Sequence, residues 1–306
     1  MRTEVIEKIY SLMKLDKNVY LLTGDLGFSV LEKIEREFPK RFVNMGVAEQ
    51  NMMGTATGLA LSGKKVFVYS IIPFATMRCF EQIRDDICYN NANVTIIGVG
   101  SGLSYGILGC THFALEDIAI LRCLPNISIV SPCDGIEAVL AIDYIYSQST
   151  PVYIRIGKKE EPTIYQKTYP FEFGKGVILS RGTDITIFST GTILKNVLDA
   201  GNILKDKYHI SASIVNLHTI KPIDIKLVVQ ESRGKKSVFT VEEHGQIGGL
   251  GSAVAEIISE YDKMPTLTRI GTPDRFIKYI GSQDYLRERL SLSPAGIVKI
   301  IRNKLS

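Results

Sequence analysis

The stretch "GVAEQNMMGTATGLALSG", from Gly46 to Gly63, has the composition of a tightly packed helix with one charged residue, Glu49. Gly54 and Gly58 lie one turn apart on one face, flanked by alanine and threonine. Such a face lets another backbone approach closely, whether it belongs to the chain's own sheet or to a partner helix. The helix dipole favours a carboxylate in the first turn, so Glu49 has an ordinary structural explanation. The alternative is partial burial, which would let the carboxylate share a proton with a nitrogen base.

The composition of the whole chain is typical of a soluble globular protein. It has 306 residues, of which 45% are hydrophobic and 22% charged, and this length suggests about two domains. The net charge of +4 is spread along the chain, which makes nucleic acid a poor candidate partner. No apolar run approaches the roughly 18 residues of a membrane span, and the charged N-terminal segment does not resemble a secretory signal.

The cysteines are odd in number and include no CxxC pair: Cys79, Cys88, Cys110, Cys123 and Cys133. This pattern favours buried thiols in a reducing compartment over a disulfide framework or a zinc site. We therefore expect a cytoplasmic protein.

Apolar, β-branched runs alternate with helical segments along the chain. The first half contains the runs "NVYLLTG", "RFVNMG", "KKVFVYS", "NVTIIGVG", "NISIVSP" and "PVYIRIG", with helical segments such as "FATMRCFEQIRDDICYNN" and "CDGIEAVLAIDYIYSQ" between them. This alternation is typical of a parallel sheet covered on both faces. A second set comprises "DITIFST", "HISASIVNLHTI", "KSVFTVEEH" and "TLTRIGT". We predict two α/β domains with mainly parallel sheets, residues 1–157 and 173–306, joined by a charged, proline-containing linker at 158–172.

Three longer stretches carry a resemblance to a known family. "FVNMGVAEQNMMGTATGLALSGKKVFVYS" and "CTHFALEDIAILRCLPNISIVSPCDGIEA" resemble the pyrimidine-binding domain of the transketolase family of thiamine diphosphate enzymes. The linker and "TVEEHGQIGGLGSAVAEII" look like the C-terminal domain of that family. The motifs occur in the family's order and together cover essentially the whole chain. Within the family, the chain is most similar to short, split transketolase-like subunits of bacterial carbohydrate metabolism.

The resemblance implies cofactor-binding roles for four residues. Glu49 matches the family's catalytic glutamate, which exchanges a proton with the aminopyrimidine ring of the cofactor and so promotes its imino tautomer. Phe74, in "IIPFATMRCFEQ", matches the aromatic residue that stacks on the pyrimidine, and an ordinary core position is its alternative role. Asp25 and Leu26, in "GDLGFS", match an Asp-Leu pair that contacts the cofactor.

The resemblance also implies substrate-binding residues. Ser29 matches a serine that contacts substrate phosphate, and a position near a helix cap explains it equally well. His112 follows Cys110-Thr111 and matches the family's active-site histidine; a structural or solvated histidine is the alternative. Arg155 ends a strand and matches an arginine that grips substrate phosphate, while a surface salt bridge is its ordinary role.

Several positions depart from the family's pattern near His112. Transketolases typically have "GEDG" before "THQ", whereas this chain has "GILGCTHF", with Ile107 and Leu108 in place of the two acids. Leu108 replaces the aspartate that recognises a substrate hydroxyl, and Gly100 replaces a phosphate-binding histidine. The resemblance therefore implies a less polar substrate pocket, and a donor or acceptor different from the usual pair.

The family's magnesium motif is missing. In the family, a GDG motif and a later asparagine hold the Mg²⁺ that binds the cofactor's diphosphate, whereas "GDLG" lacks the middle glycine and no asparagine pair follows. The resemblance therefore implies that this chain contributes no metal ligands. A second subunit with the diphosphate-binding domain would supply them, in an α2β2 heterotetramer.

The resemblance implies a transferase subunit that moves a two-carbon ketol unit between a ketose donor and an aldose acceptor, which are sugars or sugar phosphates. The alternative enzyme is a decarboxylating relative, similar to the beta subunit of 2-oxo acid dehydrogenases or to deoxyxylulose phosphate synthase. Loss of the hydroxyl-recognising aspartate favours that alternative. A regulatory subunit without cofactor is the non-enzymatic alternative. The joint presence of Glu49, Phe74 and His112 argues against it.

Overall fold

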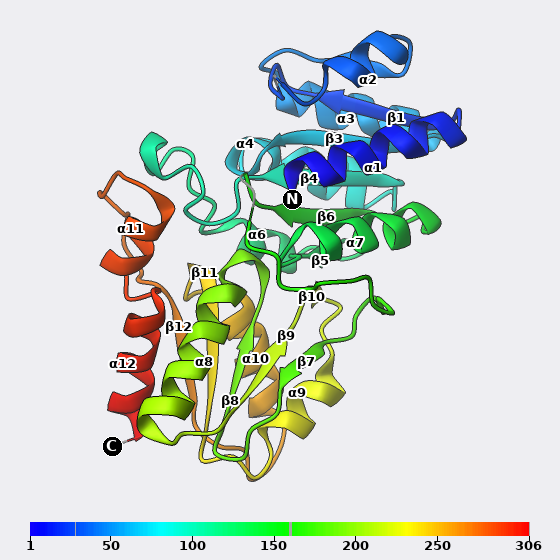
Figure 1. The fold of residues 1–306 in the computed structure, drawn as a ribbon. Helices are drawn as coiled ribbons and strands as arrows, with labels where there is room; N and C mark the ends of the chain where they lie inside the picture. The colour runs from blue at the N-terminus through cyan, green and yellow to red at the C-terminus, as the bar shows by residue number, and fades with distance from the viewer. Residues whose placement is uncertain (28, 159–160, 306) are drawn as a thin grey trace.

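The protein folds around two β-sheets, which lie one beyond the other along the molecule (Figure 1). The structure, a computed structural model, describes residues 1–27, 29–158 and 161–305. Residues 159 and 160 of the expected linker lie outside the described residues.

The first half contains α1 (Arg2–Leu15), β1 (Val19–Thr23), α2 (Glu32–Glu37), β2 (Phe42–Asn44), α3 (Glu49–Leu61), β3 (Lys65–Ile71), α4 (Ile72–Thr76), α5 (Phe80–Gln82), η1 (Ile83–Cys88), β4 (Val94–Val99), η2 (Gly106–Leu108), α6 (Asp117–Arg122), β5 (Ser128–Val130), α7 (Gly135–Ser147) and β6 (Val152–Ile156). The second half contains β7 (Val177–Ser180), β8 (Ile185–Ser189), η3 (Gly191–Ile193), α8 (Leu194–Tyr208), β9 (Ala212–Asn216), β10 (Thr219–Lys221), α9 (Ile225–Ser232), β11 (Ser237–Gly245), α10 (Leu250–Ser259), β12 (Leu267–Thr272), α11 (Gln283–Arg289) and α12 (Pro294–Leu305). None of the described helices is long and apolar enough to cross a membrane.

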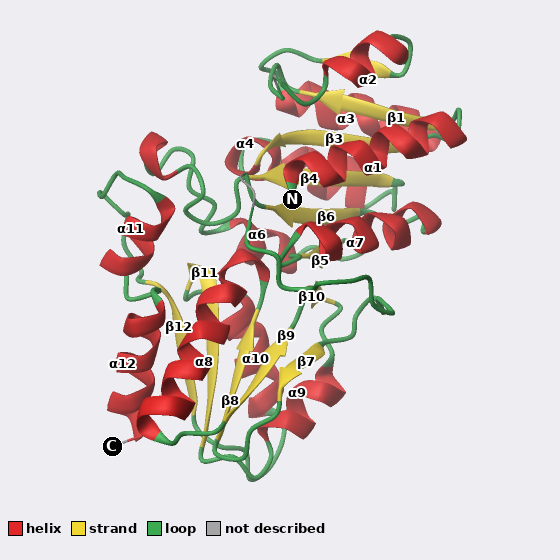
Figure 2. Cartoon of the chain, in the orientation of Figure 1, coloured by secondary structure: helices red, strands yellow, loops and turns green. Residues whose placement is uncertain are grey.

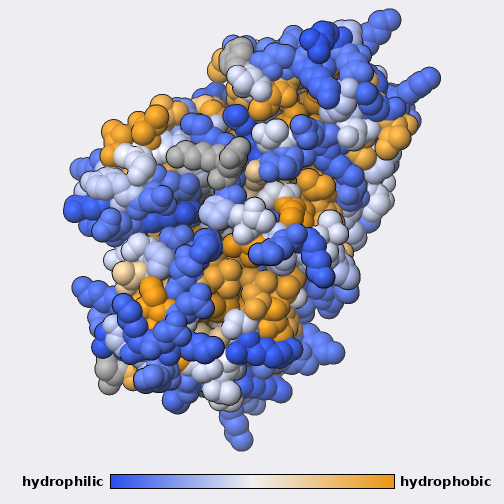
Figure 3. All heavy atoms as spheres, in the orientation of Figure 1, coloured by the Kyte–Doolittle hydropathy of each residue, from blue (hydrophilic) through white to orange (hydrophobic). Residues whose placement is uncertain are grey.

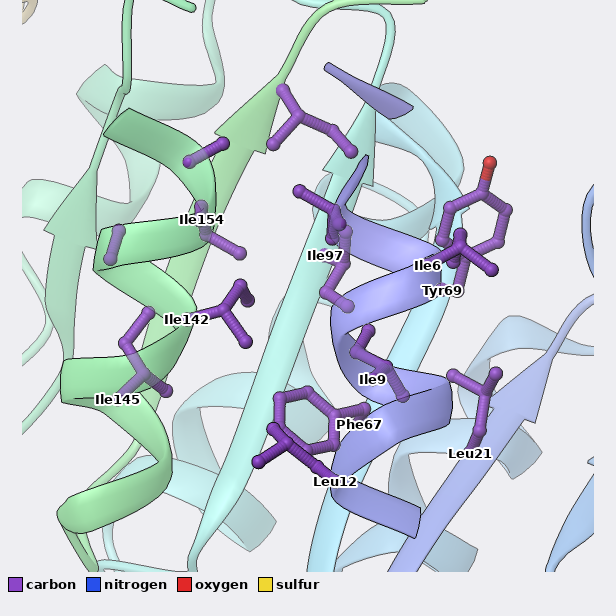
Figure 4. Close-up of a cluster of buried hydrophobic side chains, with 14 of the residues drawn as sticks. Ile6, Ile9, Leu12, Leu21, Phe67, Tyr69, Ile97, Ile142, Ile145 and Ile154 are labelled. Carbon is purple, nitrogen blue, oxygen red and sulfur yellow. The ribbon is translucent and has the colours of Figure 1, made fainter. Parts of the chain in front are cut away.

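The first sheet has the strand order β10-β5-β6-β4-β3-β1-β2 and is parallel except for β10. Figure 4 shows α1 and α7 on one face, where Ile9 and Ile142 point toward side chains of the strands such as Phe67 and Ile97. The opposite face is covered by α3, η1 and α6, and Met52 is among the fully buried side chains there. The sheet is therefore covered on both faces, which explains why its strands read as continuous apolar runs.

The predicted helix at 74–91 is interrupted. A short α4 is followed by a turn at Met77–Cys79, then by α5 and the wide π-turns of η1. Cys79 has φ −120° and ψ 30°, outside the helical region, and this residue breaks the helix. Apolar periodicity continues across the break, which is why the sequence reads as one helix.

The second sheet has the order β12-β11-β8-β9-β7. It is parallel except for the edge strand β7, which pairs antiparallel with β9. Helices α8 and α12 pack on one face, and α9 and α10 pack on the other (Figure 2). Strand β7 is not among the predicted strands; it is only four residues long, and all four are half-buried.

Strand β10 links the two halves of the molecule. It follows β9 of the second sheet, yet it pairs antiparallel with β5 at the edge of the first sheet. Ser131 N–H also donates to the carbonyl of His218 at 2.7 Å. A single division of the chain near residue 173 therefore does not describe the first sheet completely.

Candidate active site

Glu49 is the first residue of α3, at the carboxyl edge of the first sheet. Its side chain is only 1% exposed. Arg78 Nη1 donates to its Oε2 at 2.8 Å. The other oxygen, Oε1, lies beside Gly24, since a Cβ at that glycine would be 3.4 Å from it. The carboxylate thus lies between the Arg78 guanidinium and the backbone at Gly24.

Phe74 lies on α4, directly after β3, and is half-buried. The guanidinium carbon of Arg78 is 4.4 Å from the centre of its ring. His112 meets the same ring edge-on, with 5.2 Å between the ring centres and 71° between the planes. Segments that follow three different strands of one sheet therefore bring Glu49, Phe74 and His112 into one cluster, at the edge where parallel α/β sheets bind ligands.

His112 has a neighbourhood that keeps its ring neutral. Burial and, to a smaller extent, the positive charge of Lys158 lower the pKa of His112 below its ordinary value. Its Nδ1 is 2.9 Å from the hydroxyl of Thr111. Tyr105 lies against it with 5.8 Å between ring centres, and Lys158 Nζ sits 4.3 Å above the Tyr105 ring. At neutral pH this imidazole has one donor and one acceptor nitrogen, and because Nδ1 pairs with Thr111, Nε2 is the nitrogen left for an oxygen-rich ligand.

Asp25 and Leu26 flank the cluster without forming part of it. Asp25 is exposed, with φ 53°, and its backbone N–H donates to Asn44 Oδ1 at 3.0 Å. Asn44 returns a bond of 3.2 Å to Asp25 Oδ1. The carbonyl of Leu26 accepts a bond from Thr23. These hydrogen bonds hold Asp25 and Leu26 next to Gly24, which itself lies beside the buried Glu49 carboxylate.

Ser29 is not brought together with His112. It is exposed, and its backbone N–H donates to Glu32 at 2.6 Å. Ser29 lines a separate cavity of about 170 Å³, together with residues of α1 such as Ile6 and Tyr10. The donor in this bond is the backbone of Ser29, and the N-cap of α2 is Leu31 without a side-chain cap bond, so the Ser29 hydroxyl does not cap that helix.

The loop that carries η2 forms an apolar rim next to His112. Ile107 is 69% exposed and Leu108 is 47% exposed. Figure 3 shows apolar side chains gathered at the upper left, over this loop. Its base is tied to the second domain, because Gly281 N–H donates to the Gly106 carbonyl at 3.3 Å. The two positions that depart from the family's acids are therefore accessible to a ligand or to another chain.

Arg155 occupies a different environment from the one expected. Its side chain is 3% exposed, and its Nε donates to Asp117 Oδ2 at 2.7 Å. Its Nη2 donates to the carbonyls of Ala114 and Glu243 at 2.7 and 3.0 Å. The geometry does not support a grip on substrate phosphate, because burial and three protein acceptors occupy the guanidinium. Arg155 instead joins the two domains.

Sequence reasoning missed Arg78, Tyr105 and Lys158. A signal for Arg78 was present, since a residue four positions after Phe74 lies on the same side of a helical turn. Tyr105 and Lys158 reach His112 only through the fold, one from the β4 loop and one from the segment after β6. No local pattern in the sequence connects them.

The residues present fit one end of thiamine diphosphate better than the other. A buried carboxylate beside a half-buried aromatic ring suits a flat nitrogen heterocycle such as the aminopyrimidine. Within residues 1–27, 29–158 and 161–305, no group of three or more His, Cys, Asp or Glu side chains could hold a metal ion.

Comparison with protein families gives two matches that agree with the two sheets. Residues 1–163 match the family described as "Transketolase, pyrimidine binding domain". Residues 174–297 match "Transketolase, C-terminal domain".

Individual relatives are similar over nearly their whole length. A putative transketolase C-terminal section from Methanocaldococcus jannaschii is 40% identical over 308 residues, covering 100% of this chain and 96% of the relative. One of the subunits of an apulose-4-phosphate transketolase from Phocaeicola vulgatus is 36% identical, covering 97% of this chain and 95% of the relative. A solved structure entitled "Split gene transketolase, inactive beta4 tetramer" has a TM-score of 0.90 and 34% identity, covering 99% of this chain and 97% of that one.

Proposed function

This chain belongs to the transketolase family, and we propose that it is the pyrimidine-binding half of a two-chain enzyme that transfers a two-carbon ketol unit from a ketose to an aldose. One observation carries the proposal: Glu49, buried at 1% exposure at the head of α3, lies in one cluster with Phe74 and His112. When bound, thiamine diphosphate supplies the electron sink for cleaving the bond next to the ketose carbonyl. The substrates are sugars or sugar phosphates.

The residues of this chain have distinct tasks in the proposal. Glu49 exchanges a proton with a ring nitrogen of the pyrimidine, and its burial keeps water from competing for that proton. Phe74 supports the ring, while the loop at Asp25 and Leu26 borders the cofactor. His112, held neutral at pH 7, orients or exchanges a proton with a substrate oxygen.

The partner is a subunit with the diphosphate and Mg²⁺ domain, in an α2β2 heterotetramer. The outer face of α3 supports this assembly. A Cβ at Gly58 would meet nothing within 4 Å, and one at Gly54 would meet only Asp86, at 3.9 Å. Val47, two residues before α3, and Leu61, its last residue, are 73% and 63% exposed. A close-packed helix with an uncovered glycine face is suited to contact with another chain.

Calorimetry tests the requirement for a partner. Thiamine diphosphate and Mg²⁺ are titrated into this chain alone and into its mixture with a partner chain that carries the GDG motif. We expect tight binding and ketol transfer only in the mixture, because the metal and the groups that hold it dominate the affinity for a diphosphate. Micromolar binding and ketol transfer by the chain alone would overturn the proposal. Gly58→Leu should block assembly, with Ala295→Leu on the exposed side of α12 as the matched control.

A decarboxylating reaction is the second candidate. The apolar rim at Ile107 and Leu108 favours it, because no acid stands there to recognise a donor hydroxyl. Comparing a ketose phosphate with pyruvate as donor for the assembled enzyme separates the two reactions. If the enzyme turned over pyruvate but not the ketose phosphate, decarboxylation would replace ketol transfer as the proposed reaction.

A further inference from the structure

Arg78 contacts both of the groups on which the proposed pyrimidine site is built. Among the described residues, its Nη1 is the one hydrogen-bond donor to the Glu49 carboxylate, at 2.8 Å. Its guanidinium carbon also lies 4.4 Å from the centre of the Phe74 ring. The side chain is 42% exposed, so the guanidinium spans the boundary between the buried carboxylate and solvent.

The local backbone determines where Arg78 points. Phe74 and Arg78 are four residues apart across one helical turn, and Arg78 N–H donates to the Pro73 carbonyl at 3.3 Å. The next residue, Cys79, is buried, and its thiol contacts the carbonyls of Phe74 and Ala75 at 3.4 and 3.2 Å. The interruption of the helix at this point thus directs Arg78 over Phe74 and toward Glu49.

The two oxygens of Glu49 have different neighbours. Oε2 receives the bond from Arg78, whereas Oε1 lies beside Gly24 and accepts no hydrogen bond from the residues that the structure describes. A fully buried carboxylate needs a compensating positive charge, and an arginine with a solvated outer side provides it at a smaller desolvation cost than a buried one. This arrangement leaves one oxygen free for a ring nitrogen.

We propose that Arg78 is a positioning residue for the reaction: it holds Glu49 by Oε2 and thereby presents Oε1 to the pyrimidine, with Phe74 keeping the guanidinium in place. This inference rests on the proposed function. A competing role is that of a stand-in, in which the guanidinium occupies the place of the pyrimidine and leaves when the cofactor binds. The two roles predict opposite changes in cofactor affinity when Arg78 is removed.

The first experiment uses the chain without cofactor. Thermal and urea unfolding are measured for Arg78→Met, Glu49→Gln and the double variant, with Arg84→Met as control because Arg84 pairs with Asp85 at the exposed surface. We expect the two sites to be coupled about fivefold or more in the unfolding equilibrium constant, because Arg78→Met strands a buried carboxylate that Glu49→Gln then removes. Additive effects would overturn the proposal, since they would mean that the pair does not hold Glu49.

The second experiment uses the assembled complex. The affinity for thiamine diphosphate is measured by calorimetry, and the exchange rate of the proton on its thiazolium C2 is measured by quenched-flow NMR. We expect Arg78→Met to slow this exchange at least about thirtyfold with affinity changed less than fivefold, and Arg78→Lys to recover part of the rate, because a positioned acid–base group contributes about 10²–10⁴ in rate. Free guanidinium ion should restore exchange in Arg78→Ala, which a merely structural arginine would not show.

The outcomes separate the two proposals. If the wild-type complex fails to bind the cofactor, the proposed function fails, while the unfolding cycle still reports on the pair. If the wild type binds and exchanges normally but Arg78→Met exchanges at the wild-type rate, positioning by Arg78 is wrong. Tighter cofactor binding in Arg78→Met would also overturn it, in favour of the stand-in.

Discussion

The Glu49–Arg78 pair and the Asp117–Arg155 pair consist of the same groups at nearly the same distance, 2.8 and 2.7 Å. They differ in what surrounds the arginine, which is 42% exposed in the first pair and 3% exposed in the second. Asp117 Oδ2 also accepts a bond of 2.6 Å from Tyr153, and Arg155 reaches carbonyls of both domains. Other protein groups surround the Asp117–Arg155 pair on all sides, whereas the Glu49–Arg78 pair has an accessible side at which a ligand can bind.

This difference teaches how a buried carboxylate is used. Where protein donors and acceptors enclose the pair, breaking it strands a charge in the interior and weakens the fold. Where one side of the pair remains accessible, its loss disturbs the fold less and leaves the carboxylate available for proton exchange. We therefore expect substitutions in the first pair to affect turnover, and those in the second to affect stability.

The largest expected effect is that of Glu49→Gln. Glutamine keeps the shape but cannot exchange a proton, so turnover of the assembled enzyme should fall by about 10²–10⁴. The unfolding free energy should change little, because Arg78 remains solvated on its outer side. Steady-state kinetics and urea unfolding of the same preparation measure both. Turnover within tenfold of wild type would show that Glu49 does not take part in the reaction, and the two pairs would then not differ in function.

Arg155→Met should have the largest effect on stability. It leaves the Asp117 carboxylate buried without its cation, so we expect a loss of about 3–5 kcal/mol in unfolding free energy. Arg181→Met is the control, because the Arg181–Glu231 pair has a 77% exposed arginine and should contribute less than about 1 kcal/mol. A stable Arg155 variant with a raised KM for a phosphorylated substrate would return Arg155 to substrate binding.

The role of the apolar rim at Ile107 and Leu108 in donor choice can be tested by restoring the two acids. Ile107→Glu combined with Leu108→Asp should shift donor preference toward ordinary ketose phosphates by about tenfold, because a charged acceptor for a buried hydroxyl contributes about 1.5–3 kcal/mol. The measurement is the ratio of kcat/KM for a ketose phosphate to that for the native donor. An unchanged ratio in a folded variant would show that Leu108 does not face the substrate, and that the rim serves another purpose.

The stability of the region around His218 should decrease as the pH falls. His218 is buried next to β10, and burial lowers its pKa, although the charge of Glu137 opposes this. The unfolded chain therefore binds a proton that the folded chain does not, so the stability is present above the unfolded pKa of about 6.5 and is lost as pH falls below it. Between pH 7.5 and 5.5 the unfolding free energy should decrease by at most about 1.4 kcal/mol per pH unit from this group. His218→Asn should flatten that slope and His209→Asn should not; equal slopes in all three proteins would exclude His218 as the source.

The smallest expected effect is that of Lys158→Met at the open site. Its charge lowers the pKa of His112 to a smaller extent than burial does, so its removal should raise that pKa while leaving it below the ordinary value. The chain has four histidines, so NMR titration of their ring protons can follow each one. A pKa of His112 that stays constant or falls would mean that Lys158 does not act on the ring.

The sequence was informative wherever local periodicity decides the structure. Continuous apolar runs predicted strands such as β3 and β4, and the stretch at Gly46 predicted α3 with Glu49 in its first turn. Periodicity does not reveal which charges will meet. Arg155 at the end of a strand is equally compatible with a ligand site and with a buried bridge, and only the position of Asp117 decides between them. Arg78 was missed because its importance comes from Glu49, 29 residues away in sequence.

Strand β10 has a consequence for how the protein is made. On the ribosome, β5 emerges before the segment that will cover its edge, which follows roughly ninety residues and several seconds later at ordinary rates of synthesis. During that interval β5 presents unpaired backbone groups to the crowded cell, where a neighbouring nascent chain can add to them. A gene truncated between the two domains would make this interval permanent. Because β10 covers the edge of β5, the two domains of this chain need to be translated as one polypeptide. The enzyme we propose is divided into two chains at a different point.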